Sequence, residues 1–285
     1  MSNLSLNSTL SFIRWRLKIA RNLTRIINKI IYLPKYFYVK NISSTISNSN
    51  KIFSTLEENG YAKVSHDLEV KAIDLLKLKG LAVNKSFIDI GPSHSIELVD
   101  AFAKLMSIEG VQDTIINYFS GRPKLWNVAL NYSDPSDQVN DSQLWHFDYG
   151  DVRQLHFMIY FTDVNIDCGP FTFIDAKESA KVIRDAFILE RFTDADLLQK
   201  FDINVQRSAI RLTGNIGDVY MADPGRILHQ GARCKKPRLV MFVTFTTPTP
   251  MSSGGSAVID SATRIKLWEG YKASCTPKLD KYTFI

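Results

Sequence analysis

The stretch QLWHFDYGDVRQLHFMIYFTDV, residues 143–164, indicates the kind of fold this chain adopts. From Gln154 onward it is an apolar run rich in aromatic residues that ends at the turn-forming Asp163, which is typical of a buried strand. Just before this run, His146 and Asp148 stand two residues apart. Side chains at positions i and i+2 of an extended segment project from the same face. The stretch therefore predicts a strand-rich core with an imidazole and a carboxylate converging beside it.

Short β-rich runs recur from about residue 125, separated by turn residues. They read LWNVALNYS, QLHFMIYFTDV, PFTFI, AIRLT, DVYMAD and RLVMFVTFTT. A helical insertion over 176–203 interrupts the series. This pattern predicts a mainly β fold, an antiparallel barrel or double-sheet roll.

Helical patterns flank the β-rich part. FSTLEENGYAKVS (53–65) predicts a short helix, a Gly turn and a strand, and VKAIDLLKLKGLAV (70–83) and SIELVDAFAKLMSIEGVQDTIINYF (95–119) have helical periodicity. We expect these two to form a helical layer over residues 70–120. We assign residues 51–248 to the main domain. A C-terminal tail, 249–285, follows with one short helical candidate, SATRIKLWEGYK.

Residues 1–50 are expected to form a basic amphipathic extension and a polar linker, NISSTISNSN (41–50). Residues 1–51 hold nine Lys or Arg and no acid, so the net charge of +6 leaves about −3 for the rest. Over residues 10–32, a basic stripe and an apolar stripe follow helical spacing; they comprise Arg14, Lys18, Arg21, Arg25 and Lys29, and Ile13, Leu17, Ala20, Leu23, Ile27 and Ile30. Three interpretations stay open: packing of the apolar side on the domain, peripheral contact with an anionic membrane or acidic partner, or organelle targeting.

The bulk composition excludes several classes of protein. No apolar run approaches the roughly 20 residues of a membrane span, and a secretory signal is not apparent. The three cysteines, Cys168, Cys234 and Cys275, include no CxxC pair, which argues against a disulfide framework and a structural zinc site. We therefore expect a cytoplasmic protein, peripheral to a membrane if the extension binds one, with no nucleic-acid partner. No sequence feature predicts an oligomeric state.

A third candidate metal ligand, His229, follows the run DVYMAD in the segment DPGRILHQG. Two imidazoles and one carboxylate can occupy one face of an octahedral metal ion and leave positions open for a cosubstrate and O2, as an Fe(II) oxygenase requires. Zinc remains an alternative metal. The histidines His66 and His94 lie outside the β-rich region and receive no role.

Arg238 opens the run RLVMFVTF, and strand alternation sends Arg238, Val240 and Phe242 to one face. An inward-facing guanidinium needs a buried anion, and its planar fork fits a dicarboxylate. The alternatives are that Arg238 caps the strand end in water, or that Arg233 in the loop ARCKKP is the anion-binding residue.

These landmarks, taken in order, resemble the phytanoyl-CoA dioxygenase family of Fe(II)/2-oxoglutarate-dependent oxygenases. The similarity covers residues 56–248, from the ENGY opening through SQLWHFD, IYFTDVNIDCGPFTFI and TGNIGDVYMADPGRILHQG to RLVMFVTF. The resemblance implies a double-stranded β-helix, a jelly-roll or cupin-like core, flanked by helices. It implies Fe(II) held by His146, Asp148 and His229, and 2-oxoglutarate held by Arg238, with Gly231, Gln143 and Tyr160 as further contacts.

The implied reaction is hydroxylation of a C–H bond with O2, releasing succinate and CO2. The substrate would be a small molecule or a lipid-derived compound. Trp145, Arg153, His156 and Arg226 are candidates for the substrate pocket, although Trp145 is equally compatible with core packing and His156 fits a core or strand-surface position better. Relatives have a Pro-Gly-Ser-His turn where this chain reads IDAKES (174–179), so the substrate is not transferable. A desaturase, epimerase or ring-forming oxidase and a non-catalytic β-roll binding module are the alternative functions, whereas Asp148 argues against a halogenase.

Overall fold

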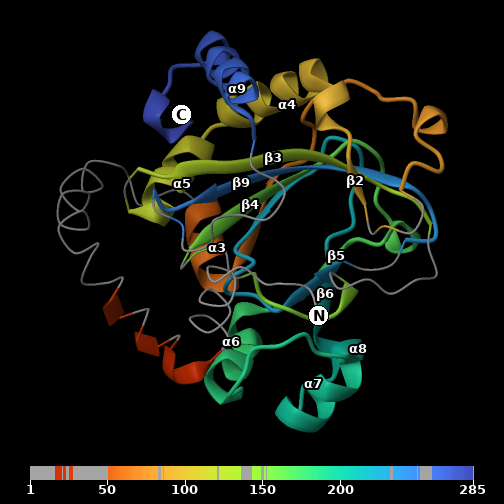
Figure 1. Cartoon of the computed structure of the whole chain (residues 1–285), viewed down its shortest axis with the longest axis vertical. Helices are drawn as coiled ribbons and strands as arrows, with labels where there is room; N and C mark the ends of the chain where they lie inside the picture. The colour runs from red at the N-terminus through yellow and green to blue at the C-terminus, as the bar shows by residue number, and fades with distance from the viewer. Residues whose placement is uncertain are drawn as a thin grey trace, which may run out of the picture.

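Two antiparallel sheets, with helices on their outer sides, form the body of the molecule (Figure 1). The computed structural model describes residues 17–20, 22–23, 26–27, 51–82, 85, 87–120, 122–135, 143–148, 151, 153–231, 234–248, 250 and 259–284. Within these residues the chain has a mixed helix and sheet composition.

The larger sheet has six strands in the order β1-β7-β4-β9-β3-β2. Their bounds are β1 Tyr61–Ser65, β2 Ile88–Asp89, β3 Lys124–Ser133, β4 Gln154–Tyr160, β7 Val219–Ala222 and β9 Arg238–Thr246. Every neighbouring pair is antiparallel. Strands that are distant in sequence, such as β4 and β9, therefore lie side by side at the centre of this sheet.

The smaller sheet has three strands in the order β6-β5-β8, with bounds β5 Phe171–Ile174, β6 Ala209–Arg211 and β8 His229–Gly231. An isolated antiparallel bridge between His146 and His229 adds the segment around His146 beside β8. A second bridge, between Trp145 and Phe192, continues this arrangement by one more segment. The residues around His146 thus serve as an additional edge of the small sheet.

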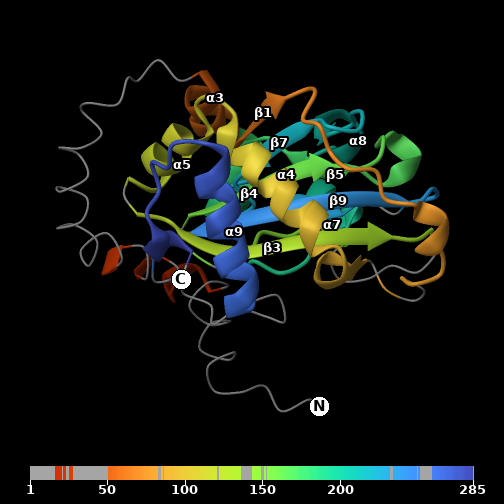
Figure 2. The same ribbon diagram turned by 90° about the horizontal axis from the view of Figure 1, so that it is seen from above.

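Helices cover the outer sides of both sheets (Figures 1 and 2). The α-helices are α3 Lys51–Asn59, α4 Ser95–Ser107, α5 Val111–Phe119, α6 Ala176–Asp185, α7 Asp194–Phe201, α8 Val205–Ser208 and α9 Ser261–Ser274. Short 3-10 turns occur at Leu75–Lys77, Gly91–Ser93, Ile166–Cys168 and Lys281–Thr283. Helices α4 and α9 lie over the large sheet, whereas α6, α7 and α8 lie beyond the small one.

Strand alternation sorts the core into an outer and an inner part. On β4, Leu155, Phe157 and Ile159 pack into the cluster that contains the helices α4 and α9. The intervening Met158 and Tyr160 pack into a second cluster between the two sheets. A one-residue shift in register would exchange these two sets, so the pattern of burial defines the register of β4.

All six β-rich runs that the sequence analysis identified contain a strand, and the expected helix, Gly turn and strand at 53–65 are present. The insertion over 176–203 contains α6 and α7, as expected. In the stretch 95–119, Gly110 adopts a left-handed conformation with φ of 81° and separates α4 from α5. This conformation is readily accessible to glycine and interrupts the helix there.

The expected helix at 70–83 is wrong. The described part of this stretch contains only the 3-10 turn at 75–77, which the Asp74 side chain begins by accepting from the Leu76 amide. Leu76 is 83% exposed, so the leucines here do not form one buried face. Gly80 has φ of 85°, a left-handed conformation that an α-helix does not contain. Without a buried apolar face, helical periodicity does not stabilise a helix.

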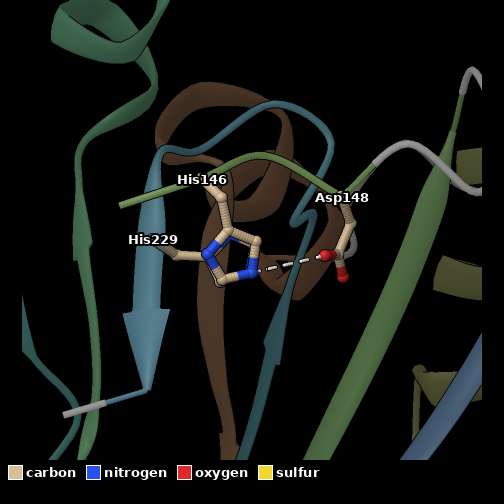
Figure 3. A group of neighbouring side chains, drawn as sticks. All are labelled: His146, Asp148 and His229. Atoms are coloured by element: carbon tan, nitrogen blue, oxygen red, sulfur yellow. Dashed lines mark ion pairs between the residues drawn. The ribbon is translucent and has the colours of Figure 1, made fainter. Parts of the chain in front are cut away.

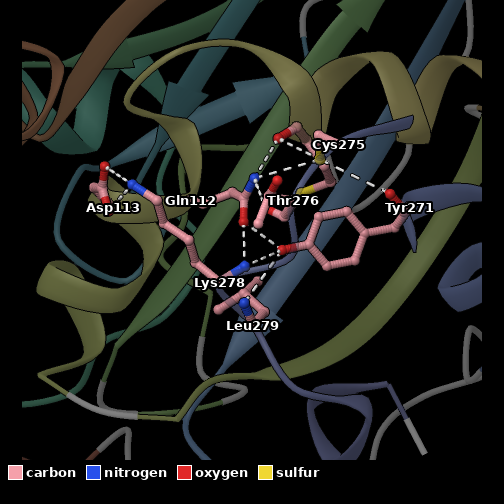
Figure 4. Close-up of polar contacts among 8 residues, drawn as sticks. Gln112, Asp113, Tyr271, Cys275, Thr276, Lys278 and Leu279 are labelled. Atoms are coloured by element: carbon pink, nitrogen blue, oxygen red, sulfur yellow. Dashed lines mark hydrogen bonds and ion pairs between the residues drawn. The ribbon is translucent and has the colours of Figure 1, made fainter. Parts of the chain in front are cut away.

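The segment that we expected as a C-terminal tail packs into the core. Leu267 and Tyr271 of α9 are fully buried, and Phe284 belongs to the same cluster. Gln112 of α5 connects this segment to the domain: it accepts hydrogen bonds from the Tyr271 hydroxyl and from the Lys278 amide (Figure 4). Arg264 donates to the carbonyl oxygens of four residues, Ile259, Leu125, Phe284 and Trp126.

Only a few residues of the N-terminal extension are described, and the expected linker at 41–50 lies outside them. Residues 18–20, 22–23 and 26–27 are helical, and the Lys18 amide donates to the Phe187 carbonyl. Ile19, Leu23, Ile26 and Ile27 are exposed, so these apolar side chains do not pack on the domain. No helix in the described ranges is long and apolar enough to cross a membrane. Cys168, Cys234 and Cys275 are free thiols, as the sequence predicts.

Candidate metal centre

Backbone pairing brings two of the predicted ligands together. The His146 amide donates to the His229 carbonyl, and the His229 amide donates to the His146 carbonyl, each at 2.9 Å. Directly opposed residues of an antiparallel pair share a face, so both imidazoles project to the same side. The Asp148 amide donates to the Pro224 carbonyl at 3.0 Å, which ties the third ligand to the turn before β8.

The three side chains converge on one point (Figure 3). The Oδ1 atom of Asp148 lies 3.7 Å from Nε2 of His146 and 3.8 Å from Nε2 of His229. The imidazole rings of the two histidines are 4.4 Å apart between centroids. One ligand atom from each residue lies within 4.8 Å of the others, and these three residues are the group that could hold a metal ion in the described structure.

The other ring nitrogen of each histidine is anchored to the backbone. Nδ1 of His146 lies 2.7 Å from the Leu144 carbonyl, and Nδ1 of His229 lies 3.2 Å from the Ile227 carbonyl. A carbonyl oxygen can only accept, so each Nδ1 is the protonated nitrogen. This tautomer directs the lone pair of each Nε2 toward Asp148, which is the arrangement that metal-binding histidines use. Phe171 stacks on the His229 ring at 5.1 Å between centroids.

Burial and charge keep these groups in their metal-binding forms. Burial and the nearby His146 lower the pKa of His229 to about 3, so its imidazole is neutral at physiological pH. Burial alone would raise the pKa of Asp148, but the imidazoles around it lower that pKa overall, with a contribution from Arg191. A neutral imidazole and an ionised carboxylate are the forms that bind a metal ion.

His156 joins the same group from β4. Its Nε2 lies 3.8 Å from Oδ2 of Asp148, the oxygen that does not face the other two histidines. Burial lowers the pKa of His156. The ring of Phe242 packs edge-on against it, at 6.4 Å between centroids. His156 therefore borders the candidate centre on the side of the second Asp148 oxygen.

Arg238 lies on the inner face of β9, as alternation predicts, because the neighbouring Val240 belongs to the cluster between the sheets. Burial lowers the pKa of Arg238, and the groups that act against this shift are Cys234, Tyr160 and Cys168 rather than any carboxylate of the described residues. A guanidinium in such a place requires an anion, and the described residues do not supply one there.

Two polar side chains that sequence reasoning missed lie next to Arg238. Ser133 pairs with Arg238 across the β3–β9 ladder, and Asn131 pairs with Val240. The Oγ atom of Ser133 and the Oδ1 atom of Asn131 are buried and have no hydrogen-bond partner within the described part of the chain. Buried polar atoms are rarely left unsatisfied. These atoms therefore point to a polar ligand in this part of the interior.

Tyr160, Gly231 and Gln143, three other predicted site residues, lie in β4, in β8 and just before the His146 segment. Tyr160 is buried on the inner face of β4 and donates from its hydroxyl to the Leu212 carbonyl. Gly231 ends β8 opposite Phe171. Gln143 is partly buried just before the His146 segment, and Arg233 lies outside the described residues.

Trp145 precedes His146 in sequence, but its side chain belongs to the core of the helical insertion. The Trp145 ring packs in the cluster under α6 and α7, and its Nε1 donates to Asp194, which is the core role that the sequence left open.

Arg153 and Arg226 gather around Glu57 at the start of the domain. Arg153 lies over the Tyr118 ring and pairs with Glu57, and Arg226 donates to the Glu57 carbonyl. Tyr118 donates in turn to Asp223, next to the turn that holds Asp148.

Comparisons with known proteins give only partial likenesses. No family model matches the sequence, and no curated protein matches it. Three partly similar solved structures are EctD from S. alaskensis with 2-oxoglutarate and 5-hydroxyectoine, HygX from Streptomyces hygroscopicus with nickel and 2-oxoglutarate, and the epimerase SnoN with Fe3+, alpha ketoglutarate and nogalamycin RO.

EctD is 16% identical with a TM-score of 0.47 and covers 70% of this chain and 78% of its own. HygX is 11% identical with a TM-score of 0.44 and covers 74% of this chain and 96% of its own. SnoN is 13% identical with a TM-score of 0.42 and covers 74% of this chain and 93% of its own. At these identities and TM-scores the likeness carries no inference about the activity of this chain.

Proposed function

We propose that this chain is an Fe(II)/2-oxoglutarate-dependent oxygenase with a double-stranded β-helix core. The observation that carries the proposal is the convergence of His146, Asp148 and His229 with both Nε2 atoms facing one carboxylate oxygen. The two antiparallel sheets, with the His146 segment as an extra edge of the smaller one, support the fold. In this fold the three ligands belong to the small-sheet side and face the space between the sheets.

The geometry of the triad fits a metal ion. Two ligand atoms of one ion with bonds of about 2.1 Å can stand at most about 4.2 Å apart. The Asp148 Oδ1 to imidazole distances of 3.7 and 3.8 Å lie inside that limit, and one ligand atom from each of the three residues lies within 4.8 Å of the others. A two-histidine, one-carboxylate face is typical of non-haem Fe(II) centres with open positions. Bound iron would supply activation of O2 beside a substrate C–H bond.

The surroundings of Arg238 fit 2-oxoglutarate. Its guanidinium can grip the distal carboxylate of the cosubstrate in a bidentate manner. Ser133 Oγ, which is otherwise unsatisfied, lies beside it and can donate to the same molecule, whereas Asn131 Oδ1, which only accepts, can bond it through a water molecule. Tyr160 lies on β4, on the side of β9 away from Ser133, and is near enough to Arg238 for the two groups to affect each other's pKa. Gly231 and Gln143 remain proposed contacts.

The chain's own part in catalysis is to hold and orient. His146 and His229 keep neutral Nε2 atoms aimed inward, and His156 lies 3.8 Å from the second carboxylate oxygen of Asp148. The apolar side chains between the sheets, such as Phe171 and Phe242, exclude water from the reacting groups. We propose hydroxylation of a small-molecule or lipid-derived substrate as the outcome. Product analysis distinguishes this from desaturation, epimerisation or ring closure on the same site.

Anaerobic reconstitution tests the proposal. The purified chain with Fe(II) and 2-oxoglutarate should develop a weak visible charge-transfer band. His146→Ala, Asp148→Ala and His229→Ala should each abolish it. His66→Ala is the matched control, because the His66 side chain is 78% exposed and lies outside the centre; it should keep the full band. A wild-type protein with neither a band nor 2-oxoglutarate turnover would refute the proposal, and a metal content without either would favour the binding-module alternative.

A further inference from the structure

We infer that the substrate is a small polar molecule whose hydroxyl or amide groups are bound by Asn127 and Thr244, on the inner face of the large sheet. This inference rests on the proposed function and deepens it, since it names the substrate class of the same site. Asn127 belongs to β3 and Thr244 to β9, and with His156 of β4 they form a row across the sheet, which we call the polar row.

The strand register places the three side chains of the polar row next to one another. Thr244 pairs directly with Asn127 on one side and with His156 on the other. Directly opposed residues of antiparallel strands project from the same face, with Cβ atoms about 4.5–5.5 Å apart. This face is the inner one, because the alternating neighbours Val243 and Phe245 pack in the outer cluster with α4 and α9. The polar row therefore faces the space between the two sheets.

One end of the polar row lies at the candidate metal centre. Nε2 of His156 lies 3.8 Å from Oδ2 of Asp148. Thr244 and Asn127 stand one and two strands away from His156, which corresponds to about 5 and 10 Å at the usual spacing of strands. A small molecule bound by Thr244 and Asn127 would therefore have its other end at the metal centre.

The polar row is separate from the proposed cosubstrate contacts. Arg238 and Thr244 lie on the same face of β9 but are six residues apart, which is about 20 Å along a strand. Phe242 stands between them and packs edge-on against His156, at 6.4 Å between ring centroids. A cosubstrate held by Arg238 approaches the centre from one end of β9. The other end, at Thr244, is left for the substrate.

The inner face of the sheet is accessible at the polar row, although its outer face is covered. Asn127 and His156 are partly exposed, and Thr244 between them is 5% exposed, whereas the outward residues Leu155 and Phe157 are fully buried. The strands β3, β9 and β4 each have a neighbouring strand on both sides. Their inward side chains are therefore exposed toward the space between the sheets, where a substrate would bind.

The chemistry of the polar row selects the substrate class. A threonine hydroxyl and an asparagine amide both donate and accept hydrogen bonds, and neither carries a charge. A substrate with hydroxyl or amide groups would replace the water bonded to these side chains, whereas an acyl chain would remove that water without replacing it. Sites built to hydrogen-bond a substrate discriminate strongly against analogues that lack the polar group. The polar row therefore favours a polar small molecule over a lipid-derived one.

The test uses Mn(II), a paramagnetic ion, in the triad of the full chain with saturating 2-oxoglutarate. The probes are myo-inositol and cyclohexanol, which share the same carbon ring and differ in their number of hydroxyl groups. The proton relaxation of each probe reports how closely it approaches the ion. We expect enhancement for myo-inositol in the wild type. The ratio of enhancement, myo-inositol to cyclohexanol, should fall by about 2-fold to 10-fold in Thr244→Val and in Asn127→Leu, the range that corresponds to one hydrogen bond.

Thr172→Val is the matched control. Thr172 is a buried threonine of β5 whose hydroxyl donates to the Pro170 carbonyl. Its neighbours Phe171 and Phe173 pack between the sheets, so Thr172 faces away from that space. The ratio of enhancement in this variant should equal that of the wild type.

The outcomes separate this inference from the proposed function. An unchanged ratio in both Thr244→Val and Asn127→Leu, no enhancement for myo-inositol in the wild type, or an equal fall in Thr172→Val overturns the inference. The anaerobic Fe(II)/2-oxoglutarate band is measured on the same proteins, and a normal band shows that a variant is folded with its centre intact. If one of the two variants lacks the band, the other decides. A missing band in the wild type overturns the proposed function, whatever the probes show.

Discussion

Replacing Arg238 or Arg264 by methionine should have opposite effects on the stability of the protein. Both are arginines of the domain whose pKa is lowered by burial. Arg264 donates to four backbone carbonyls at 2.6 to 3.3 Å. Arg238 has no carboxylate partner among the residues described. We predict that Arg238→Met weakens 2-oxoglutarate binding but stabilises the unliganded protein, whereas Arg264→Met destabilises the protein and leaves binding unchanged.

The magnitudes follow from these contacts. Removing one partner of a buried, hydrogen-bonded charge pair costs about 2–5 kcal/mol, which corresponds to a rise in the Kd for 2-oxoglutarate of about 30-fold to 4000-fold. In the absence of the cosubstrate, removing the unpaired Arg238 charge should raise the free energy of unfolding by roughly 1 kcal/mol. Loss of the Arg264 contacts should lower it by at least about 3 kcal/mol, since carbonyl oxygens are left unsatisfied in the core.

Two measurements decide the matter. Titration of 2-oxoglutarate into the anaerobic Fe(II) protein, followed by the visible band, gives the Kd. Urea unfolding of the metal-free proteins at 25 °C gives the free energies. Wild-type affinity in Arg238→Met, or a loss of stability in that variant comparable to that of Arg264→Met, would refute the reasoning. The first outcome would move the cosubstrate contact elsewhere, and Arg233 is the next candidate.

Three further predictions concern acid titration, an unsatisfied hydroxyl and the N-terminal helix. Burial raises the pKa of Asp223 to about 6, so between about pH 4 and pH 6 the folded protein keeps a proton that the unfolded chain releases. The free energy of unfolding should therefore fall by about 2–3 kcal/mol as the pH rises through this window. In urea unfolding Asp223→Asn should lack this fall, and the same pH dependence in the wild type and the variant would contradict the assignment. Ser133→Ala should raise the Kd for 2-oxoglutarate by about 3-fold to 10-fold without loss of stability, whereas Ser179→Ala, which removes a hydroxyl bonded to two backbone groups, should lose stability only. The chain should sediment with phosphatidylserine vesicles more than with neutral ones, and a Leu23→Ser, Ile26→Ser double variant should bind about tenfold less because both side chains are exposed; equal sedimentation of both proteins would exclude this contact.

The elements that sequence predicts well are those whose burial is continuous. The run at 154–164 is apolar at most positions because β4 is covered on both faces, by helices and by the small sheet. The three-residue strand β8 at His229–Gly231 has too few residues for any periodicity, so it was not predicted. The false helix at 70–83 has the right spacing but leaves Leu76 in water, and spacing alone does not report on a partner surface.

Some residues of the candidate site can be predicted from the sequence, and others cannot. His146 and Asp148 are recognisable because two residues of separation place them on one face of an extended segment, and the structure brings them together with His229. Asn131 and Ser133 were missed because a polar residue on a strand normally marks a solvent-facing position.

The bridge between Trp145 and Phe192 has a consequence for how this sequence can vary. Trp145 and Phe147 face the core under α6 and α7, and His146 and Asp148 face the candidate metal centre. Because the side chains alternate in this way, a residue cannot be inserted into or deleted from the segment Trp145–Asp148 without exchanging the two faces. Deleting one of these residues would turn an indole toward the centre and an imidazole toward the helices. We therefore expect homologous chains to vary in length on either side of this tetrapeptide, and in the insertion above it, while the tetrapeptide itself changes by substitution alone.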